Sequence, residues 1–143
     1  MSVQISPETD HLDPLQLRAT FCRVQVLIVD DSALVRRMVI AQLEGTGRYD
    51  LVVAAGDGNE AIGLAELMQP DVVLLDLSMP GLGGLEALPL VLAVAPHARV
   101  IVMSGSTSDE MAVRVLAAGA VDYLEKGTEL DLPGIIDAVL GGA

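Results

Sequence analysis

Short apolar runs and segments with helical spacing alternate along the chain. Five runs have the length and aliphatic composition of strands: Val24–Val29, Leu51–Ala55, Asp71–Leu75, Arg99–Met103 and Val121–Leu124. Runs of Val, Leu and Ile without polar alternation are typical of strands that are buried on both faces, as in parallel sheets. The run that ends at Leu75 is the clearest, and we expect it to be the central strand.

The first strand is followed by a predicted helix that begins after Ser32 and runs to about Leu43. Serine commonly caps helix N-termini, because its hydroxyl accepts a hydrogen bond from a backbone N–H of the first turn. Helical spacing predicts an apolar face that packs on the sheet. The residues expected on this inward face are Leu34, Val35, Met38 and Val39.

Capping residues predict two of the later helices. Asp57 and Glu60 have the spacing of a capping box before the second helix. Thr107 and Glu110 have the same spacing, before a helix that is expected to run through Ala118.

A further helix is expected within Leu85–Ala95, and Pro89 falls inside it. Proline removes a backbone donor, so this helix is expected either to kink or to begin late. The segment Leu88–Ala95 is apolar almost all round, unlike an ordinary surface helix. Two simple explanations are a misplaced helix boundary and cover by residues 1–23. Our hypothesis is an apolar contact surface for a partner or a second copy of the chain.

Strand and helix alternate five times along residues 24–143, and the last helix is expected near Pro133–Leu140. Connections of this length suit crossover helices rather than hairpins, which predicts an α/β fold. We therefore expect a parallel sheet that is covered on both faces by helices. Residues 1–23 are mixed and polar, and we interpret them as an N-terminal extension with a helix near Leu15–Phe21.

Composition narrows the classes of function. The chain has 143 residues, which suit one domain with a core of its own. Its net charge of −12 repels phosphate backbones and anionic lipids, and this argues against direct binding of nucleic acid or of membranes. Cys22 is the single cysteine, and the sequence shows neither a signal peptide nor an apolar run that could span a bilayer. We therefore expect a cytoplasmic protein.

Polar side chains follow four of the five predicted strands. Asp30 and Asp31 follow the first strand, and Asp76 follows the third. Ser104 follows the fourth strand, and Lys126 follows the fifth. The carboxyl ends of parallel strands lie at one edge of the sheet, where open α/β sheets bind their ligands. If the strand order reverses between the first and third strands, the three aspartates meet at that edge.

Three carboxylates at one edge repel one another, by about 4 kcal/mol for a pair about 4 Å apart at an effective dielectric of about 20. Such a cluster needs a cation, a raised pKa or water between its members. An all-oxygen site with few protein donors favours Mg²⁺. A carboxylate nucleophile, a divalent ion, a lysine and a hydroxyl together suit phosphoryl transfer to an aspartate, with Asp76 as the acceptor.

Each of these residues has a simpler interpretation when it is taken alone. An aspartate after a strand commonly caps the next helix, a serine such as Ser104 fits a turn, and Lys126 fits a solvated surface. Their coincidence at successive strand ends favours the functional interpretation.

Four segments resemble the receiver domain of two-component response regulators. These segments are Asp30-Asp31-Ser32, Asp76 with Met79-Pro80-Gly81, Val102–Gly105 and Tyr123–Lys126. The resemblance covers about residues 24–142. We interpret residues 24–143 as one receiver domain. Within the family, Asp30–Arg36 and Ala120–Tyr123 are most similar to chemotaxis regulators, including the receiver of the methylesterase type.

The resemblance implies a flavodoxin-like, doubly wound sheet of five parallel strands in the order 2-1-3-4-5. It also implies that Asp76 accepts a phosphoryl group from a histidine kinase or a histidine phosphotransfer protein. Asp31, Asp76 and the backbone carbonyl of Ser78 would bind Mg²⁺ (or Mn²⁺), and Asp30 would act through water.

The resemblance implies roles for the other strand-end residues too. Lys126 would pair with the phosphoryl group, and Ser104 would hydrogen-bond to it. Tyr123 would be an aromatic switch that moves with Ser104, although a half-buried strand tyrosine is an equally good interpretation. Ser78 and Ser106 resemble positions that tune self-dephosphorylation.

The leading hypothesis is a stand-alone phosphoacceptor that signals by changing its affinity for a downstream protein, because no output domain follows the last helix. Turnover of outside substrates is not expected. One alternative is a scaffold receiver that binds partners regardless of phosphorylation. Another is a small haloacid-dehalogenase-like phosphatase, which also uses a nucleophilic aspartate. That family has an Asp-x-Asp motif at its first strand, however, whereas Asp76 follows the third strand here. Gly127 departs from the receiver pattern, since many receivers have a cis proline there.

Overall fold

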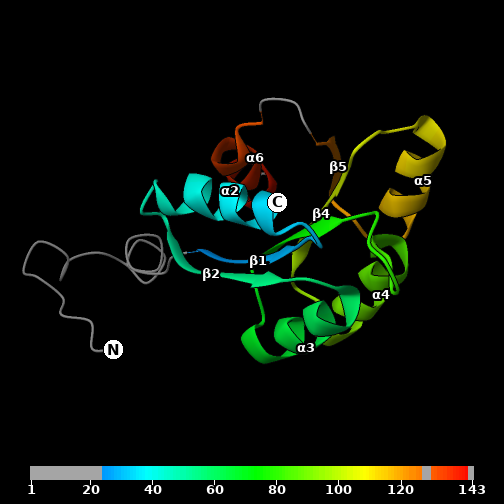
Figure 1. Ribbon diagram of the computed structural model, residues 1–143, viewed down its shortest axis with the longest axis horizontal. Helices are drawn as coiled ribbons and strands as arrows, with labels where there is room; N and C mark the ends of the chain where they lie inside the picture. The colour runs from blue at the N-terminus through cyan, green and yellow to red at the C-terminus, as the bar shows by residue number, and fades with distance from the viewer. Residues whose placement is uncertain (1–23, 127–129, 142–143) are drawn as a thin grey trace, which may run out of the picture.

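The computed structural model describes residues 24–126 and 130–141. The expected extension over residues 1–23, its helix near Leu15–Phe21 and the position of Gly127 lie outside the described residues. Figure 1 shows the arrangement of the described helices and strands.

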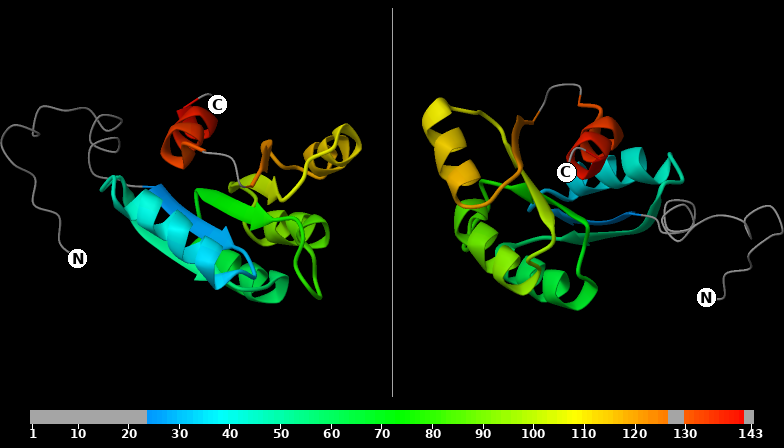
Figure 2. Two further views of the ribbon diagram at one scale, coloured as in Figure 1. Left: turned by 45° about the horizontal axis from the view of Figure 1, so that its top comes forward. Right: turned by 180° about the vertical axis from the view of Figure 1, so that it is seen from behind.

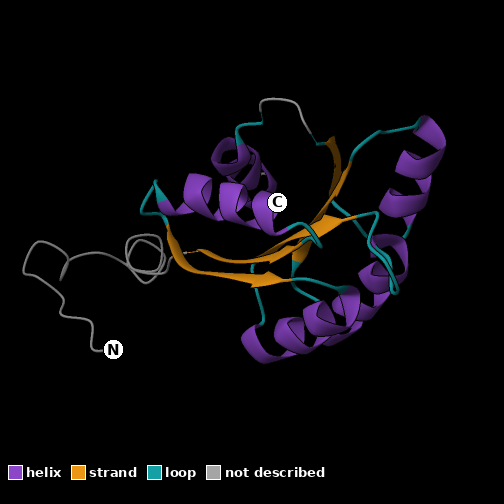
Figure 3. Cartoon of the chain, in the orientation of Figure 1, coloured by secondary structure: helices purple, strands orange, loops and turns teal. Residues whose placement is uncertain are grey.

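Within the described residues, five parallel strands form one sheet in the order β2-β1-β3-β4-β5, which confirms the predicted fold class and strand order. The strands are β1 (Val24–Val29), β2 (Tyr49–Ala55), β3 (Val72–Asp76), β4 (Arg99–Ser104) and β5 (Asp122–Glu125). The helices are α2 (Ala33–Glu44), α3 (Gly58–Met68), α4 (Gly84–Val94), α5 (Asp109–Ala117) and α6 (Leu132–Gly141). Strand and helix alternate throughout this part of the chain (Figure 3).

The helices cover both faces of the sheet. Helices α2 and α6 lie on one face, and α3, α4 and α5 lie on the other (Figures 1 and 2). Alternate residues of β1 face the two layers, because side chains alternate along a strand. Leu27 and Val29 belong to the core under α3 and α4, whereas Val26 and Ile28 belong to the core under α2 and α6.

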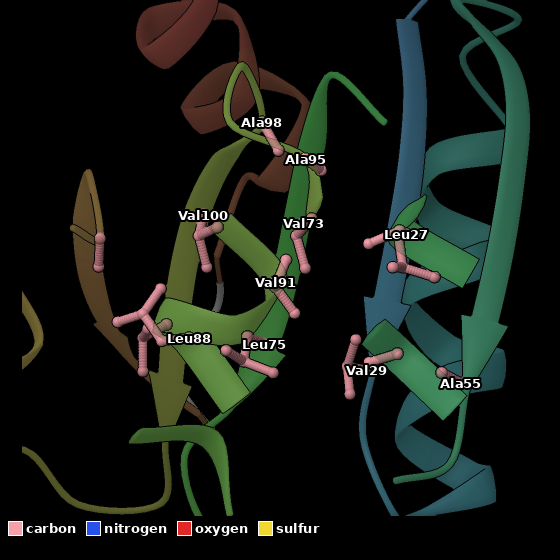
Figure 4. Packing of buried hydrophobic residues seen from close by; sticks show 14 of the residues in the cluster. Leu27, Val29, Ala55, Val73, Leu75, Leu88, Val91, Ala95, Ala98 and Val100 are labelled. Carbon is pink, nitrogen blue, oxygen red and sulfur yellow. The ribbon is translucent and has the colours of Figure 1, made fainter. Parts of the chain in front are cut away.

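Strand β3 is buried along its whole length. Val73 and Leu75 pack against Leu88 and Val91 of α4 (Figure 4). Val72 and Leu74 belong to the opposite core, on the side of α2 and α6. The unbroken aliphatic run therefore follows from the position of β3 between β1 and β4, with helices on both sides.

The predicted inward face of α2 is wrong at two positions. Leu34 is 65% exposed and Met38 is 63% exposed, whereas Val39 and Leu43 are buried. A helix turns about 100° per residue, so the face that meets the sheet through Val39 and Leu43 also holds the half-buried Val35. Leu34 and Met38 lie beside this face and point to solvent. The cap at Ser32 is confirmed, since its hydroxyl accepts the Val35 N–H at 3.3 Å.

The predicted cap of α5 is also wrong. Ser108, and not Thr107, is the N-cap residue, and its hydroxyl accepts the backbone N–H of Met111 at 3.1 Å. Thr107 has the spacing of a capping box with Glu110, but the chain enters the helix one residue later. The predicted cap of α3 is confirmed, because the Asp57 carboxylate accepts the Glu60 N–H at 2.8 Å.

Helix α4 does not begin late, because Pro89 lies inside a helix that starts at Gly84. The apolar sequence of this helix is explained in part by burial of Ala87, Leu88 and Val91 against the sheet and α3. Pro89, Leu90 and Ala93 are exposed, so part of the predicted contact surface faces outward, and its partner stays a prediction. Within the described ranges, none of the helices has both the length and the apolar character needed to cross a membrane.

Candidate functional site

The sheet order brings the predicted site residues to one edge. Asp30 follows β1, Asp76 ends β3 and Ser104 ends β4. Lys126 follows β5, and its backbone N–H donates to the carbonyl of Ser104 at 2.7 Å. Since β3 lies between β1 and β4, Asp76 stands at the centre of this edge.

Asp30, Asp31 and Asp76 form a cluster of carboxylates. Each contributes one oxygen, and these oxygens all lie within 4.8 Å of one another. Asp30 and Asp76 are buried, whereas Asp31 is exposed and leaves the cluster open to solvent. An all-oxygen group of this size fits a hard divalent cation such as Mg²⁺, which keeps several waters and needs few protein ligands.

Lys126 supplies a positive charge to the same cluster. Its Nζ lies 2.6 Å from Oδ2 of Asp30 and 2.9 Å from Oδ1 of Asp76. Burial acts to lower the pKa of Lys126, but hydrogen bonds from its ammonium to the two carboxylates outweigh burial and raise that pKa. The lysine is therefore held in its charged form between two buried acids.

The charged form of Asp76, unlike that of Lys126, is disfavoured in the folded protein. Burial raises the pKa of Asp76, and the charge of Asp30 adds to this rise, although the ammonium of Lys126 opposes it. The Ser78 N–H donates to Oδ1 of Asp76 at 3.2 Å, which is the oxygen that also faces Lys126. A further cation beside this carboxylate would relieve the excess of negative charge.

The main chain and side chain of Asp30 are both anchored. Oδ1 of Asp30 accepts the N–H of Ser32 at 2.8 Å, and the N–H of Asp30 donates to the Ala55 carbonyl at 3.1 Å. The Asp30 carbonyl accepts a hydrogen bond from Nη1 of Arg36. Sequence reasoning missed Arg36, although an arginine four residues into a helix that starts at the site was a usable indication.

Ser104 and Tyr123, the predicted switch pair, meet at one backbone atom. The Ser104 hydroxyl donates to the Ser106 carbonyl at 2.8 Å, and the Tyr123 hydroxyl donates to the same carbonyl at 3.5 Å. The side chain of Ser104 is buried, and that of Tyr123 is half-buried. The two residues are thus linked through the loop between β4 and α5, while the Ser104 hydroxyl is bonded within that loop.

The structure therefore brings together Asp30, Asp31, Asp76 and Lys126, and places Ser104 at the same edge. The metal-ligand role of the Ser78 carbonyl and the tuning roles of Ser78 and Ser106 stay predictions.

Sequence reasoning also missed Gly84, at the start of α4. A Cβ at this position would lie 2.2 Å from the carbonyl oxygen of Asp76 and 2.7 Å from Cα of Leu77. The Gly84 N–H donates to the Leu77 carbonyl at 2.9 Å. The absence of a side chain thus lets α4 begin directly against the backbone of Asp76.

Comparison with known proteins decides the family. A family model described as the response regulator receiver domain matches residues 26–137. The chain belongs to this family. Receiver domains act in two-component signalling, and they generally bind Mg²⁺ at an acidic pocket.

One curated relative is a protein-glutamate methylesterase/protein-glutamine glutaminase from Azospirillum brasilense, which is 39% identical over 117 residues. The match covers 80% of this receiver chain but only 30% of that protein. The chain therefore spans less than a third of the length of this relative.

Solved structures give the same fold. Chemotaxis protein CheY4 from Vibrio cholerae has a TM-score of 0.76 and 30% identity, and the match covers 82% of this receiver and 99% of that chain. A chain of the CheX–CheY–BeF3–Mg²⁺ complex from Borrelia burgdorferi has a TM-score of 0.71 and 26% identity, with 83% and 88% covered.

Proposed function

We propose that this receiver domain accepts a phosphoryl group on Asp76 from a histidine kinase or a histidine phosphotransfer protein. The observation that supports this proposal best is the position of Asp76, buried at the end of β3 between Lys126 and the other two aspartates. Asp30, Asp31, Asp76 and the Ser78 carbonyl would hold Mg²⁺ (or Mn²⁺). When bound, the ion neutralises charge on the carboxylates and on the incoming phosphoryl oxygens.

The residues of the chain supply the rest of the chemistry. An oxygen of the Asp76 carboxylate attacks the phosphorus of a phosphohistidine, so that a P–O bond forms as the P–N bond breaks. The imidazole nitrogen leaves with the bonding electron pair. Lys126 donates to a phosphoryl oxygen, because its ammonium already lies at hydrogen-bond distance from Oδ1 of Asp76. Ser104 donates to another phosphoryl oxygen once its hydroxyl leaves the Ser106 carbonyl.

The output of this reaction is a change in affinity for a downstream protein in the cytoplasm. A complex of CheX with CheY, BeF3 and Mg²⁺ supports this view, since there a receiver in the presence of a phosphoryl mimic binds a partner. The acceptor hydrolyses only its own phosphoaspartate and does not turn over outside substrates.

Incubation with Mg²⁺ and acetyl phosphate tests the proposal. Wild type is expected to gain the mass of one phosphoryl group, and Asp76→Asn is expected to gain none. Asp50→Asn is a matched control, because Asp50 is an exposed aspartate on β2. Equal phosphorylation of wild type and Asp76→Asn would rule out Asp76 as the acceptor.

A further inference from the structure

We propose that Arg36 is a positioning residue for the phosphoacceptor site, and that it fixes the peptide unit from which the Asp30 and Asp31 side chains project. This inference rests on the proposed function, because it concerns the metal-binding half of the same site. Arg36 lies in α2 and touches neither carboxylate in an ion pair, so its effect would pass through the backbone.

Arg36 contacts the carbonyl oxygen of Asp30, which belongs to the peptide unit that joins Asp30 to Asp31. Nη1 of Arg36 donates to the carbonyl oxygen of Asp30 at 2.5 Å. That carbonyl belongs to the planar peptide unit between Asp30 and Asp31, so its orientation is shared by both residues. Fixing this plane therefore limits the directions in which the two carboxylates point.

Other hydrogen bonds anchor the N–H and the side chain of Asp30. Within the described ranges, no backbone N–H of a neighbouring strand donates to the Asp30 carbonyl. Strand β1 ends at Val29, and the N–H of Asp30 makes the last bond toward β2, to the Ala55 carbonyl. The side chain of Asp30 is held by Ser32 and Lys126. Within the described ranges, the Asp30 carbonyl receives its hydrogen bond from Arg36.

The guanidinium lies beside Gly56, the residue that follows β2. Its Nη1 lies 3.5 Å from the position that a Cβ of Gly56 would occupy, which is ordinary van der Waals distance. The Gly56 N–H donates to Oε2 of Glu60 at 3.2 Å, so the loop beneath the guanidinium is anchored to α3. Arg36 is half-buried there, which restricts its rotamers.

The neighbouring Arg37 provides a matched comparison. It carries the same charge one residue further along α2, but its side chain is exposed. No hydrogen bond or ion pair is made by its side chain to the part of the chain that the structure describes. Loss of Arg37 therefore removes a charge near the acidic site without removing a contact to the Asp30 carbonyl.

The test is calorimetric titration of Mg²⁺ into wild type, Arg36→Ala, Arg36→Lys and Arg37→Ala at constant ionic strength. Changes to groups that orient metal ligands commonly weaken metal binding by about 10-fold to 100-fold, and we expect Arg36→Ala to fall in this range. Arg36→Lys keeps the charge with a shorter reach and is expected to lie between wild type and Arg36→Ala. Arg37→Ala is expected to change the affinity by less than about twofold, since an exposed charge is screened by salt.

Thermal unfolding in EDTA separates positioning from a general loss of structure. Arg36→Lys is expected to unfold near the wild-type temperature and still to bind Mg²⁺ more weakly. Unchanged Mg²⁺ affinity in both Arg36 variants would overturn the inference while leaving the proposed function intact. Equal weakening in Arg36→Ala and Arg37→Ala would also overturn it, in favour of a general electrostatic effect. If wild type itself binds no Mg²⁺, the proposed function fails and the inference fails with it.

Discussion

Nζ of Lys126 lies 2.9 Å from Oδ1 of Asp76, across the carboxyl edge of the sheet. The same ammonium lies 2.6 Å from Oδ2 of Asp30, so one cation balances two acids whose side chains are almost fully buried. Two buried carboxylates with no counter-charge are unfavourable, because burial strengthens their repulsion and removes their hydration. The lysine therefore stabilises these two buried carboxylates in the folded state.

Lys126→Met is expected to destabilise the protein in EDTA by about 3 kcal/mol or more, the usual cost of leaving a buried charge without its partner. Part of the lost stability is expected to be recovered in Mg²⁺, because a bound metal ion would supply part of the positive charge that Lys126 provides. Urea unfolding with and without Mg²⁺ measures both effects. Lys126→Arg, which keeps the charge, is the control. A loss of the same size in both variants would show that packing, and not charge, is responsible.

The raised pKa of Asp76 predicts how stability depends on pH without Mg²⁺. Burial is the largest cause of the rise from the ordinary value of 3.8. A carboxyl group with a higher pKa in the folded state favours folding only while it is protonated, so stability falls as pH rises from below 3.8 through the folded pKa.

Asp76→Asn removes this titration and is expected to be more stable than wild type in EDTA at neutral pH. The difference in unfolding temperature should be small below pH 3.8 and should grow as pH rises through the folded pKa. Thermal unfolding of both proteins across this range measures it. Wild type that is the more stable of the two at neutral pH would contradict the prediction.

The fold and the clustering of charges could be predicted because they depend on patterns that a sequence states directly. The apolar run before Asp76 is too short for a typical helix and does not alternate, which favours a central parallel strand, and the order of strand and helix leaves few topologies. Once the sheet is parallel, strand ends share an edge, so the convergence of Asp30 and Lys126 follows from the topology.

Details that depend on side-chain approach could not be predicted. Leu34 and Met38 fit an apolar helical face as well as Val35 and Val39 do, and only docking of α2 on the sheet decides which pair faces the core. The hydrogen bond from Arg36 to the Asp30 carbonyl depends on the distance between α2 and the end of β1, which periodicity does not encode.

Asp31→Asn is expected to weaken Mg²⁺ binding by about 10-fold or more while changing the Mg²⁺-free unfolding free energy by less than about 0.5 kcal/mol. The reason is that Asp31 is exposed but contributes an oxygen to the carboxylate cluster. Calorimetric titration and urea unfolding in EDTA measure the two quantities. Asp50→Asn, an exposed change on β2, should alter neither. Wild-type affinity in Asp31→Asn would exclude Asp31 as a ligand.

Gly84→Ala is expected to cost about 1–3 kcal/mol of stability, because the new methyl group would overlap backbone atoms that cannot move independently. Its Cβ would lie 2.2 Å from the carbonyl oxygen of Asp76, the phosphoacceptor candidate. Gly83→Ala is the matched control, since the nearest atom to its Cβ would be 3.6 Å away. Urea unfolding measures both. Similar losses in the two variants would attribute the effect to glycine flexibility rather than to overlap.

The shared hydrogen bonds at the Ser106 carbonyl predict how Ser104 and Tyr123 respond to a phosphoryl group. If the Ser104 hydroxyl turns toward a bound anion, it leaves this carbonyl, and the environment of the Tyr123 ring should change as the β4–α5 loop moves. Beryllofluoride with Mg²⁺ is therefore expected to shift the ring resonances of Tyr123 in wild type.

Ser104→Ala removes the hydroxyl that moves, so the shift at Tyr123 is expected to be lost or strongly reduced, while Mg²⁺ affinity stays within about twofold of wild type because the carboxylates are untouched. The sequence contains two tyrosines, and Tyr49, at the start of β2, serves as the internal reference in the same spectrum. A full Tyr123 shift in Ser104→Ala would mean that the ring responds to the anion by a route that does not include the Ser104 hydroxyl. Absence of a shift in wild type would favour the interpretation of Tyr123 as a half-buried strand residue.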